Sequence, residues 1–380
     1  MRKALVAALV VLVLTVAWTS GTRAASPIKI GAPLLLTGTG AYVGGASKET
    51  LEMIVSAFNK AGGVNGRPIE IVYYDEEAKP DVAVSVVKRL IQKDQVQAIL
   101  GISTSWTAMP VIPVIEQAKV PAILLAASTA IVDPVKPWVF KTVPDDRITV
   151  SKMLSDMESK GIKRIALTSS QDAFGDGGRT EITSQVAAHN IKIVFDERYN
   201  MDDTDITPLL SKIKNTDAQA VVNWSSRRAL VVMTNNYRQI GLQLPLYHSN
   251  AALSPDFIEA TGKNAEGVRT ASAKILAGDS LADNDPQKKV IIGYMKAFKE
   301  KYGKEGTQFG AIAFDAFNIL TAALKKAPDD KAKLRDAIEQ TKGYVGVMGI
   351  FTYGPKDHSG LSRDSLVMYE VQGGSWKPFK

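Results

Sequence analysis

Small hydroxyl residues stand directly after apolar runs that are typical of buried strands. Ser103, Thr104 and Ser105 follow the run VQAILGI, and Ser128 and Thr129 come just after VPAILLA. Where a helix begins at such a loop, its unpaired amides and partial positive charge favour an anion, and each serine adds a donor. The pattern indicates a site that could hold a carboxylate without an arginine.

An alternative explanation of Ser105 needs no ligand. Serine is a preferred N-cap residue in any helix, so Ser105 could do no more than cap the helix that starts there. A single loop of this kind favours the capping explanation. Two hydroxyl-rich loops after adjacent strands of one sheet leave capping and anion binding equally open.

The stretch TGTGAYVGGA at residues 37–46 invites a dinucleotide-binding interpretation, because Gly38, Gly40 and Gly44 lie between an apolar run and a helical pattern. Such a site requires an acidic residue about 20 positions after its glycines. Asp75, at the end of the second predicted strand, comes much later than that. We therefore interpret the glycines as a flexible turn that lets backbone approach a ligand, with Tyr42 offering its ring to a cleft.

Groups that could carry catalysis or bind a metal are few. The chain has no cysteine, which removes thiol nucleophiles and thiolate ligands. His189, His248 and His358 lack metal-ligand spacing, and we interpret each as an ordinary surface or strand-end histidine. Neither a G-x-S-x-G elbow nor a Walker lysine occurs. We predict no enzyme, no cofactor and no metal; the alternative, an exported hydrolase, lacks an identifiable nucleophile and base.

Residues 1–24 have the pattern of a secretory signal peptide. Arg2 and Lys3 precede an apolar run over residues 4–18, and small residues at Thr22 and Ala24 form a cleavage site. The apolar run is shorter than the ~20 residues that span a bilayer, which disfavours a retained anchor. We expect cleavage after Ala24 and a periplasmic mature chain.

The charged residues do not predict a nucleic-acid surface. The chain has 46 Lys plus Arg against 39 Asp plus Glu, a net charge of +7. Part of this excess lies in the predicted leader. The other basic residues alternate with acids and lack interleaved aromatics, so we interpret them as solvated helix faces.

Alternating apolar runs and amphipathic segments predict parallel sheets covered by helices on both faces. Two such series occur in a chain longer than the ~250 residues at which single cores stop growing, so we predict an α/β fold of two doubly wound lobes. The predicted strands are 28–36, 69–75, 96–102, 120–126, 162–170, 191–197, 218–224 and 244–250; the predicted helices are 47–60, 81–92, 106–117, 175–189, 206–214, 228–240, 289–302 and 309–327.

The last hundred residues do not form a third series. They contain a strand-like run, two helices and a tail with the character of a β-ribbon. Sharing them between the lobes makes the chain cross more than once, which favours a multi-crossing hinge. We predict that residues 26–143 and 272–349 form lobe 1, and that residues 144–271 and 350–380 form lobe 2.

An ordered series of strings resembles the type I periplasmic solute-binding proteins of ABC importers, in the branched-chain amino-acid (Leu/Ile/Val) binding family. The resemblance covers nearly the whole mature chain. It implies two lobes joined by three crossings, a small ligand closed between them, and delivery to a membrane permease. Its carriers are IKIGAPLLLTGTGAYVGGA, FNKAGGVNGRPIEIVYYDEEAKPDVAVSVVKRLI, VQAILGISTSWTAMPVIPVIEQAKVPAILLAAST, QDAFGDGG and TDITPLLSKIKNTDAQAVV.

The resemblance also implies which residues surround the ligand. Ser105 and Ser128 match the hydroxyl residues that hold the ligand carboxylate, with Ala126 as a backbone contact between them. Tyr42 and Phe309 match aromatic residues of the cleft. These five positions follow the family's pattern.

Other positions depart from the family's pattern. Phe174 stands where many amino-acid binders have a tyrosine, and Trp224, Ser225 and Ser226 fall on a loop that usually adds another aromatic residue. Asn250 stands where the amino-acid binders carry a glutamate against the ligand ammonium. This last departure bears directly on the chemistry of the ligand.

We hypothesise that the ligand has a carboxylate but no α-ammonium, because a buried ammonium without a carboxylate partner is costly. An aromatic or aliphatic organic acid fits, and Trp106, Phe174 and Trp224 would suit a flat apolar body. In the alternative, these aromatics are core packing and the ligand is a hydrophobic amino acid whose ammonium meets Asp172 or backbone carbonyls.

The expected mechanism is capture by closure of the lobes, with no bond made or broken. Arg227 and Arg228 could pair with a second anionic group, although a solvated helix start is the favoured interpretation of both. The expected partners are a small carboxylate ligand and a permease, and we expect a monomer. An extracellular ligand-sensing module with the same lobes is a further alternative.

Overall fold

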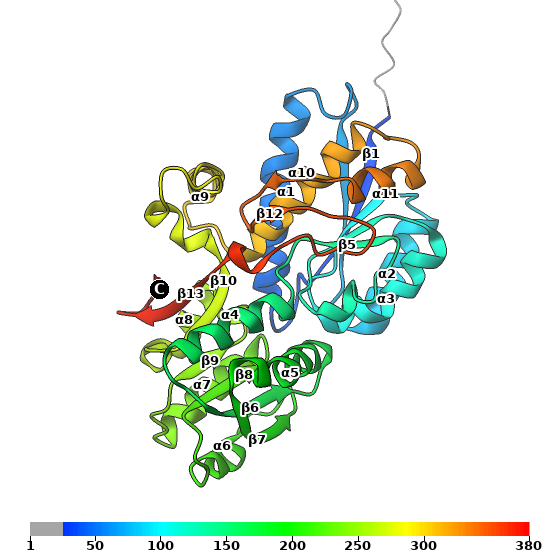
Figure 1. Ribbon diagram of the computed structural model, residues 1–380. Helices are drawn as coiled ribbons and strands as arrows, with labels where there is room; N and C mark the ends of the chain where they lie inside the picture. The colour runs from blue at the N-terminus through cyan, green and yellow to red at the C-terminus, as the bar shows by residue number, and fades with distance from the viewer. Residues whose placement is uncertain (1–25, 380) are drawn as a thin grey trace, which may run out of the picture.

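The computed structural model describes residues 26–379, so the predicted signal peptide lies outside the described residues. Two parallel sheets with flanking helices build the chain, and Figure 1 shows one sheet in the upper half and the other in the lower half. Both sheets contain the order second, first, third, fourth, fifth strand of their series, a doubly wound order. The predicted α/β class is confirmed.

The first sheet comes from the N-terminal series and is parallel throughout. Its strands, in spatial order, are β2 (Ile69–Asp75), β1 (Ile28–Leu34), β3 (Ala98–Gly101), β4 (Ala122–Leu124) and β5 (Val139–Lys141). The helices of this part are α1 (Ala41–Lys60), α2 (Pro80–Gln92), α3 (Ser105–Ala118), α10 (Gln308–Leu324) and α11 (Lys331–Glu339). Helix α10 returns from late in the chain to pack along α1 (Figure 1).

The second sheet has a parallel part and an antiparallel edge, because β13 and β14 form the predicted ribbon. Its strands are β14 (Ser375–Phe379), β13 (Leu366–Gln372), β10 (Arg269–Ala273), β9 (Leu246–His248), β8 (Ala220–Trp224), β6 (Arg164–Ser170) and β7 (Lys192–Tyr199). The helices here are α4 (Asp146–Ser159), α5 (Ala173–Gln185), α6 (Thr207–Ile213), α7 (Arg228–Gln239) and α8 (Pro255–Thr261).

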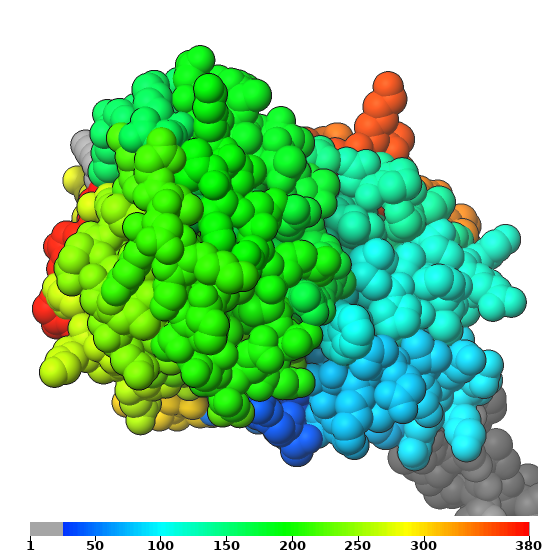
Figure 2. Space-filling model, turned by 90° about the horizontal axis from the view of Figure 1, so that it is seen from below, coloured from blue at the N-terminus to red at the C-terminus, as the bar shows by residue number. Residues whose placement is uncertain are grey.

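The chain passes between the two sheets three times. It crosses after β5, again through α9 (Lys288–Tyr302), and a third time after β12 (Ile350–Phe351), which pairs with β11 (Tyr344–Val345). Seen from below, the second half of the molecule (green) lies in front, and the N-terminal part (blue to cyan) shows beside it (Figure 2). The lobe boundaries stay a prediction, and the one at residue 349 falls between the paired strands β11 and β12.

Several elements differ from the sequence-based expectation. Helix α4 was not expected, because it buries the acidic residues Asp146 and Asp156 and therefore lacks a clean apolar stripe. Helix α1 begins at Ala41 rather than residue 47, so Gly44 is helical and its interpretation as a flexible turn is wrong. A side chain there would overlap the carbonyl oxygen of Leu35, so Gly44 allows α1 to approach the end of β1.

The end of β1 and the start of α1 still contain a turn. Gly38 and Gly40 have φ values of 79° and 98°, a region that favours glycine. Across residues 26–379, no helix is long and apolar enough to cross a membrane.

Candidate ligand-binding site

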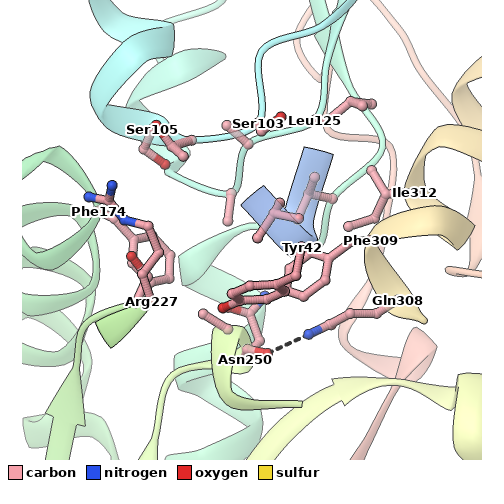
Figure 3. A pocket seen from close by; sticks show the side chains of 17 residues that line it. Tyr42, Ser103, Ser105, Leu125, Phe174, Arg227, Asn250, Gln308, Phe309 and Ile312 are labelled. Carbon is pink, nitrogen blue, oxygen red and sulfur yellow. Dashed lines mark hydrogen bonds between the residues drawn. The ribbon is translucent and has the colours of Figure 1, made fainter. Parts of the chain in front are cut away.

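A cavity lies where the carboxyl ends of both parallel sheets face each other, the usual place for a ligand in doubly wound folds. Its volume, measured as space for the centre of a water molecule, is about 70 Å³. One water needs roughly 10–15 Å³ by this measure, so the cavity suits a small organic molecule. The lining residues are Tyr42, Val43, Ser103, Thr104, Ser105, Leu125, Ala126, Ala127, Val143, Phe174, Ser226, Arg227, Asn250, Ala251, Gln308, Phe309 and Ile312 (Figure 3).

The start of α3 forms one wall of this cavity. Thr104 is the N-cap residue and accepts a hydrogen bond from the Thr107 amide through Oγ1 at 3.3 Å. The capping explanation of Ser105 is therefore wrong. Instead, Ser105 Oγ accepts a hydrogen bond from the Ser128 amide at 3.1 Å. The amides of Ser105 and Trp106 precede the first intrahelical bond, donated by Ala108, so this end of α3 can receive an anion.

Two hydrogen bonds fix Ser103 and with it the loop after β3. Its hydroxyl oxygen accepts a hydrogen bond from the Leu35 amide at 3.0 Å, and its amide donates to Glu76 Oε1 at 2.8 Å. Burial raises the pKa of Glu76 to about 7. This carboxyl group supports the loop and does not line the cavity.

An aromatic pair closes a second wall. The rings of Tyr42 on α1 and Phe309 on α10 meet edge to face, with centroids 5.6 Å apart. Burial raises the pKa of Tyr42 to about 12, so its hydroxyl stays protonated and can donate. The two helices thus bring together residues far apart in the sequence (Figure 3).

Seven of the ten predicted ligand contacts line the cavity, and three do not. Trp106 is 43% exposed and lines an outer hollow, to which both halves of the molecule contribute, for example Lys79 and Asn200. Trp224 is fully buried and packs on Phe174, with ring centroids 5.8 Å apart. The seven that line it are Tyr42, Ser105, Ala126, Phe174, Ser226, Asn250 and Phe309.

Ser128 is the third predicted contact outside the cavity. It is fully buried, and its Oγ has no hydrogen-bond partner within residues 26–379. A Cβ atom on Gly177 of α5 would lie 2.8 Å from this oxygen and 2.6 Å from Asp146 Oδ2. The Ser128 hydroxyl therefore faces the junction of α4 and α5, whereas its amide supports Ser105.

Gln308 and Arg227 are lining residues that the sequence interpretation did not select. Gln308 Nε2 donates to the carbonyl oxygens of Asn250 at 2.8 Å and Leu253 at 2.9 Å, and its Oε1 accepts from the Ser272 hydroxyl at 2.9 Å. Its amide thus ties α10 to the second sheet (Figure 3). Its place beside Phe309 at the predicted helix start was the available signal.

Arg227 was expected at a solvated helix start, but it lines the cavity. Its neighbour Arg228 is exposed, as expected. Of the residues described here, those lining the cavity include Arg227 and no Asp, Glu or Lys. Arg227 lies in the loop after β8, next to Ser226, and this position in the sequence indicated that it could face the cavity.

Asp172, the acidic residue considered as a partner for a ligand ammonium, does not line the cavity. It caps α5, and its Oδ1 accepts hydrogen bonds from the Gly175 amide and the Ser170 hydroxyl, each at 2.8 Å. This oxygen is therefore already committed to the protein.

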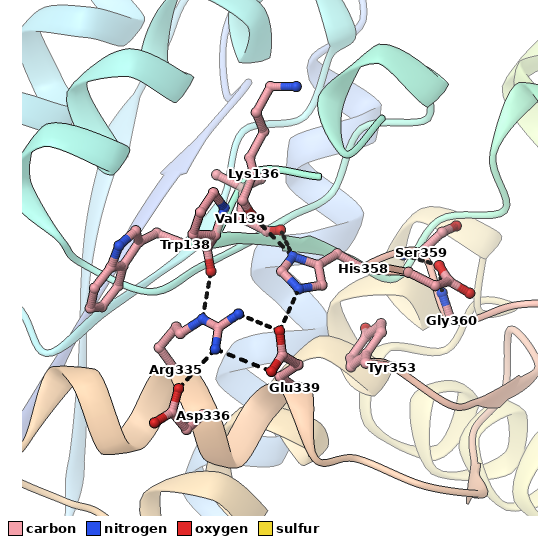
Figure 4. A network of polar contacts seen from close by, with 12 residues as sticks. Lys136, Trp138, Val139, Arg335, Asp336, Glu339, Tyr353, His358, Ser359 and Gly360 are labelled. Atoms are coloured by element: carbon pink, nitrogen blue, oxygen red, sulfur yellow. Dashed lines mark hydrogen bonds and ion pairs between the residues drawn. The ribbon is translucent and has the colours of Figure 1, made fainter. Parts of the chain in front are cut away.

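His248 and His358 are both buried. His248 ends β9, as the strand-end interpretation expected, whereas the interpretation of His358 as a surface or strand-end residue is wrong. Burial lowers the pKa of His248, at the end of β9, to about 3. His358 Nε2 contacts Glu339 Oε1 at 3.1 Å, and Glu339 pairs with Arg335 (Figure 4). Across residues 26–379, no cluster of three or more His, Cys, Asp or Glu residues could hold a metal ion.

Relatives of known sequence have similar lengths. The chain is 26% identical over 324 residues to the leucine-, isoleucine-, valine-, threonine- and alanine-binding protein of Pseudomonas aeruginosa, covering 84% of each chain. It is 22% identical over 342 residues to the Leu/Ile/Val-binding protein of Escherichia coli K12, covering 89% of each. Both names describe binding proteins rather than enzymes.

Solved structures share the fold. An extracellular ligand-binding receptor from Rhodopseudomonas palustris HaA2 superposes with a TM-score of 0.86 at 26% identity, covering 93% of this chain and 100% of that one. The substrate-binding protein of a branched-chain amino acid transporter from Streptococcus pneumoniae, solved with isoleucine, gives 0.82 at 22% identity, covering 92% and 98%. Residues 27–375 match the family model described as periplasmic binding protein, and the chain belongs to that family.

Proposed function

We propose that this chain is the periplasmic solute-binding component of an ABC importer and that its ligand is a small organic acid, aromatic or aliphatic. Membership of the periplasmic binding protein family supports the first part. The charge of the cavity lining supports the second, because it contains Arg227 and Asn250 but no acidic side chain among the described residues.

The two ends of an amino acid need opposite partners in a binding site. A buried ammonium that loses its hydration needs a carboxylate partner, and none of the lining side chains provides one. A carboxylate, by contrast, meets hydroxyl groups, the free amides at the start of α3 and a guanidinium. The cavity therefore favours a ligand that is anionic overall.

Capture requires both halves of the molecule. Ser105, Tyr42 and Phe309 face the cavity from the first sheet and its helices, and Phe174 and Asn250 face it from the second. A ligand that touches both sides stabilises the closed arrangement by its differential affinity for it. The bound form would then be delivered to a membrane permease, and the chain would act as a monomer.

A hydrophobic amino acid is the second candidate. The names of the Pseudomonas and Escherichia relatives and the isoleucine in the Streptococcus structure favour it. In that case backbone carbonyls would have to accept the ammonium protons, since Asp172 does not line the cavity.

Matched ligand pairs separate the two candidates. We would refold the purified mature chain to remove bound ligand and measure affinities by calorimetry for leucine against 4-methylpentanoate and phenylalanine against 3-phenylpropanoate. Each pair differs only in the α-ammonium. We expect the acid to bind at least about tenfold more tightly than its amino acid, since an unpaired buried charge costs several kcal/mol. Equal or tighter binding of leucine would establish the amino-acid candidate instead.

A further inference from the structure

Arg227 has an unusual backbone and an unpaired side chain. It is the residue before α7, and its φ of 54° lies in the left-handed region that L side chains rarely adopt. Its Nε is buried without a hydrogen-bond partner, and no acidic side chain of residues 26–379 forms an ion pair with it. The residue as a whole is half-buried, so this buried nitrogen is a donor without a partner in an otherwise accessible side chain.

The side chain of Arg227 extends from the second lobe to the first. A Cβ atom on Gly40, in the turn before α1, would lie 2.7 Å from Arg227 Cδ and 3.0 Å from Cγ. Gly40 therefore leaves the space through which the arginine stem passes. The same side chain lines the cavity and two outer hollows, so it forms part of the partition between the cavity and the surface.

The start of α3 lies on the same side of the cavity. Thr104 and Ser105 line the cavity together with Arg227, and Trp106, the next residue of α3, lines an outer hollow with it. Two positive features, a helix N-terminus of the first lobe and a guanidinium of the second, thus converge at a cavity whose lining, within residues 26–379, has no acidic side chain, whereas Glu77, Asp172 and Asp202 line only the outer hollow.

We propose that Arg227 is a specificity-determining residue that donates hydrogen bonds to the ligand carboxylate held at the start of α3, so that one anion joins the two lobes. This inference rests on the proposed binding of an organic acid. The ligand would supply the counter-charge that Arg227 lacks in the protein. An anion bound at the start of α3 would also explain why Arg227 lies between the cavity and the surface. In that position Arg227 can pair with the anion only when the lobes are closed.

The test compares an acid with its neutral carboxamide in two proteins. Affinities for 3-phenylpropanoate and 3-phenylpropanamide would be measured by calorimetry for the full mature chain and for R227Q. We expect R227Q to weaken binding of the acid about tenfold or more, the range of a lost hydrogen bond to a charged group, and to change binding of the amide less than about threefold. R227K keeps the positive charge but lacks the paired N–H donors of a guanidinium. Its affinity for the acid should therefore lie between that of the unmodified chain and that of R227Q.

Controls distinguish this role from a packing role. R228Q removes the neighbouring exposed charge and should leave both affinities unchanged, and the melting temperature without ligand reports whether each variant is folded. If R227Q weakens the acid and the amide equally, or neither, Arg227 does not bind the carboxylate, and the proposed function still stands. If the unmodified chain binds none of the acids, the proposed function fails and this inference fails with it.

Discussion

The amide of Ser128 donates a hydrogen bond of 3.1 Å to the hydroxyl oxygen of Ser105. This bond joins the loops after β3 and β4 and leaves the Ser105 hydrogen free to point toward a ligand. The Ser128 hydroxyl faces α4 and α5 instead. The two serines, expected to act alike, therefore have different roles.

S105A should affect both stability and binding. It leaves the buried Ser128 amide without its acceptor, which should lower the free energy of unfolding by about 1–3 kcal/mol, and it removes one donor to the carboxylate. S128A removes a hydroxyl that has no partner and keeps the amide, so we expect a smaller effect on both. Thermal unfolding and calorimetry with 3-phenylpropanoate measure the two quantities. Loss of affinity in S128A as large as in S105A would restore the direct contact that the family resemblance implies.

The loops after predicted strands and the family resemblance together indicated most of the candidate site from sequence. The residues that were predicted wrongly depend on the direction in which each side chain points. Ser105 was found because it follows a strand whose carboxyl end faces the cleft, whereas Phe174 and Asn250 were found through the family resemblance. Trp106 and Trp224 lie next to the same loops, but their side chains do not point into the cavity. Rotation along a helix sets the direction of Trp106, and alternation along a strand sets that of Trp224.

The role of the charged residue Arg227 could not be predicted from the sequence either. Arg227 resembled a solvated residue because its sequence neighbours show no partner, and its exposure depends on the turn at Gly40, which belongs to the opposite lobe. Contacts between lobes involve segments far apart in the chain, so a single sequence does not reveal them.

Gly44 and Gly45 provide a matched test of the packing between α1 and β1. G44A would place a methyl group on the backbone of Leu35, which cannot yield as a flexible side chain does, and should destabilise the protein by about 1–3 kcal/mol. G45A meets nothing within 4 Å in the same helix and should stabilise by roughly 0.5–1 kcal/mol through the better helix propensity of alanine. Denaturant unfolding of both variants measures the difference, and equal effects would argue against close contact at Gly44.

Glu76 should make stability depend on pH. Burial raises its pKa to about 7 in the folded chain, against ~4.3 in an unfolded one, so folding favours the protonated form. This contribution is fully present below the unfolded pKa and is lost as pH rises through about 7; its full size is on the order of 3 kcal/mol. We expect the melting temperature to fall between pH 5 and pH 8.

E76Q should reduce that pH dependence. A glutamine oxygen can still accept the hydrogen bond from the Ser103 amide, and the side chain cannot ionise. The variant should therefore be more stable than the parent chain at pH 8 and similar at pH 5. E70Q, at an exposed position of β2, serves as the control and should leave the profile unchanged. A profile for E76Q parallel to that of the parent would show that Glu76 does not titrate in this range.

Asn250 offers a change of ligand class by one substitution. Its backbone carbonyl oxygen accepts a hydrogen bond of 2.8 Å from Gln308 Nε2, which fixes the backbone while the side chain faces the cavity. N250E would add the carboxylate that an ammonium needs and would repel a ligand that is only anionic. We expect the ratio of leucine affinity to 4-methylpentanoate affinity to rise by at least about tenfold, with N250Q, which adds length without charge, leaving the ratio within about threefold. An unchanged ratio in N250E would mean that the ammonium of a bound amino acid does not lie near residue 250, and the argument from Asn250 to an organic acid would lose its basis.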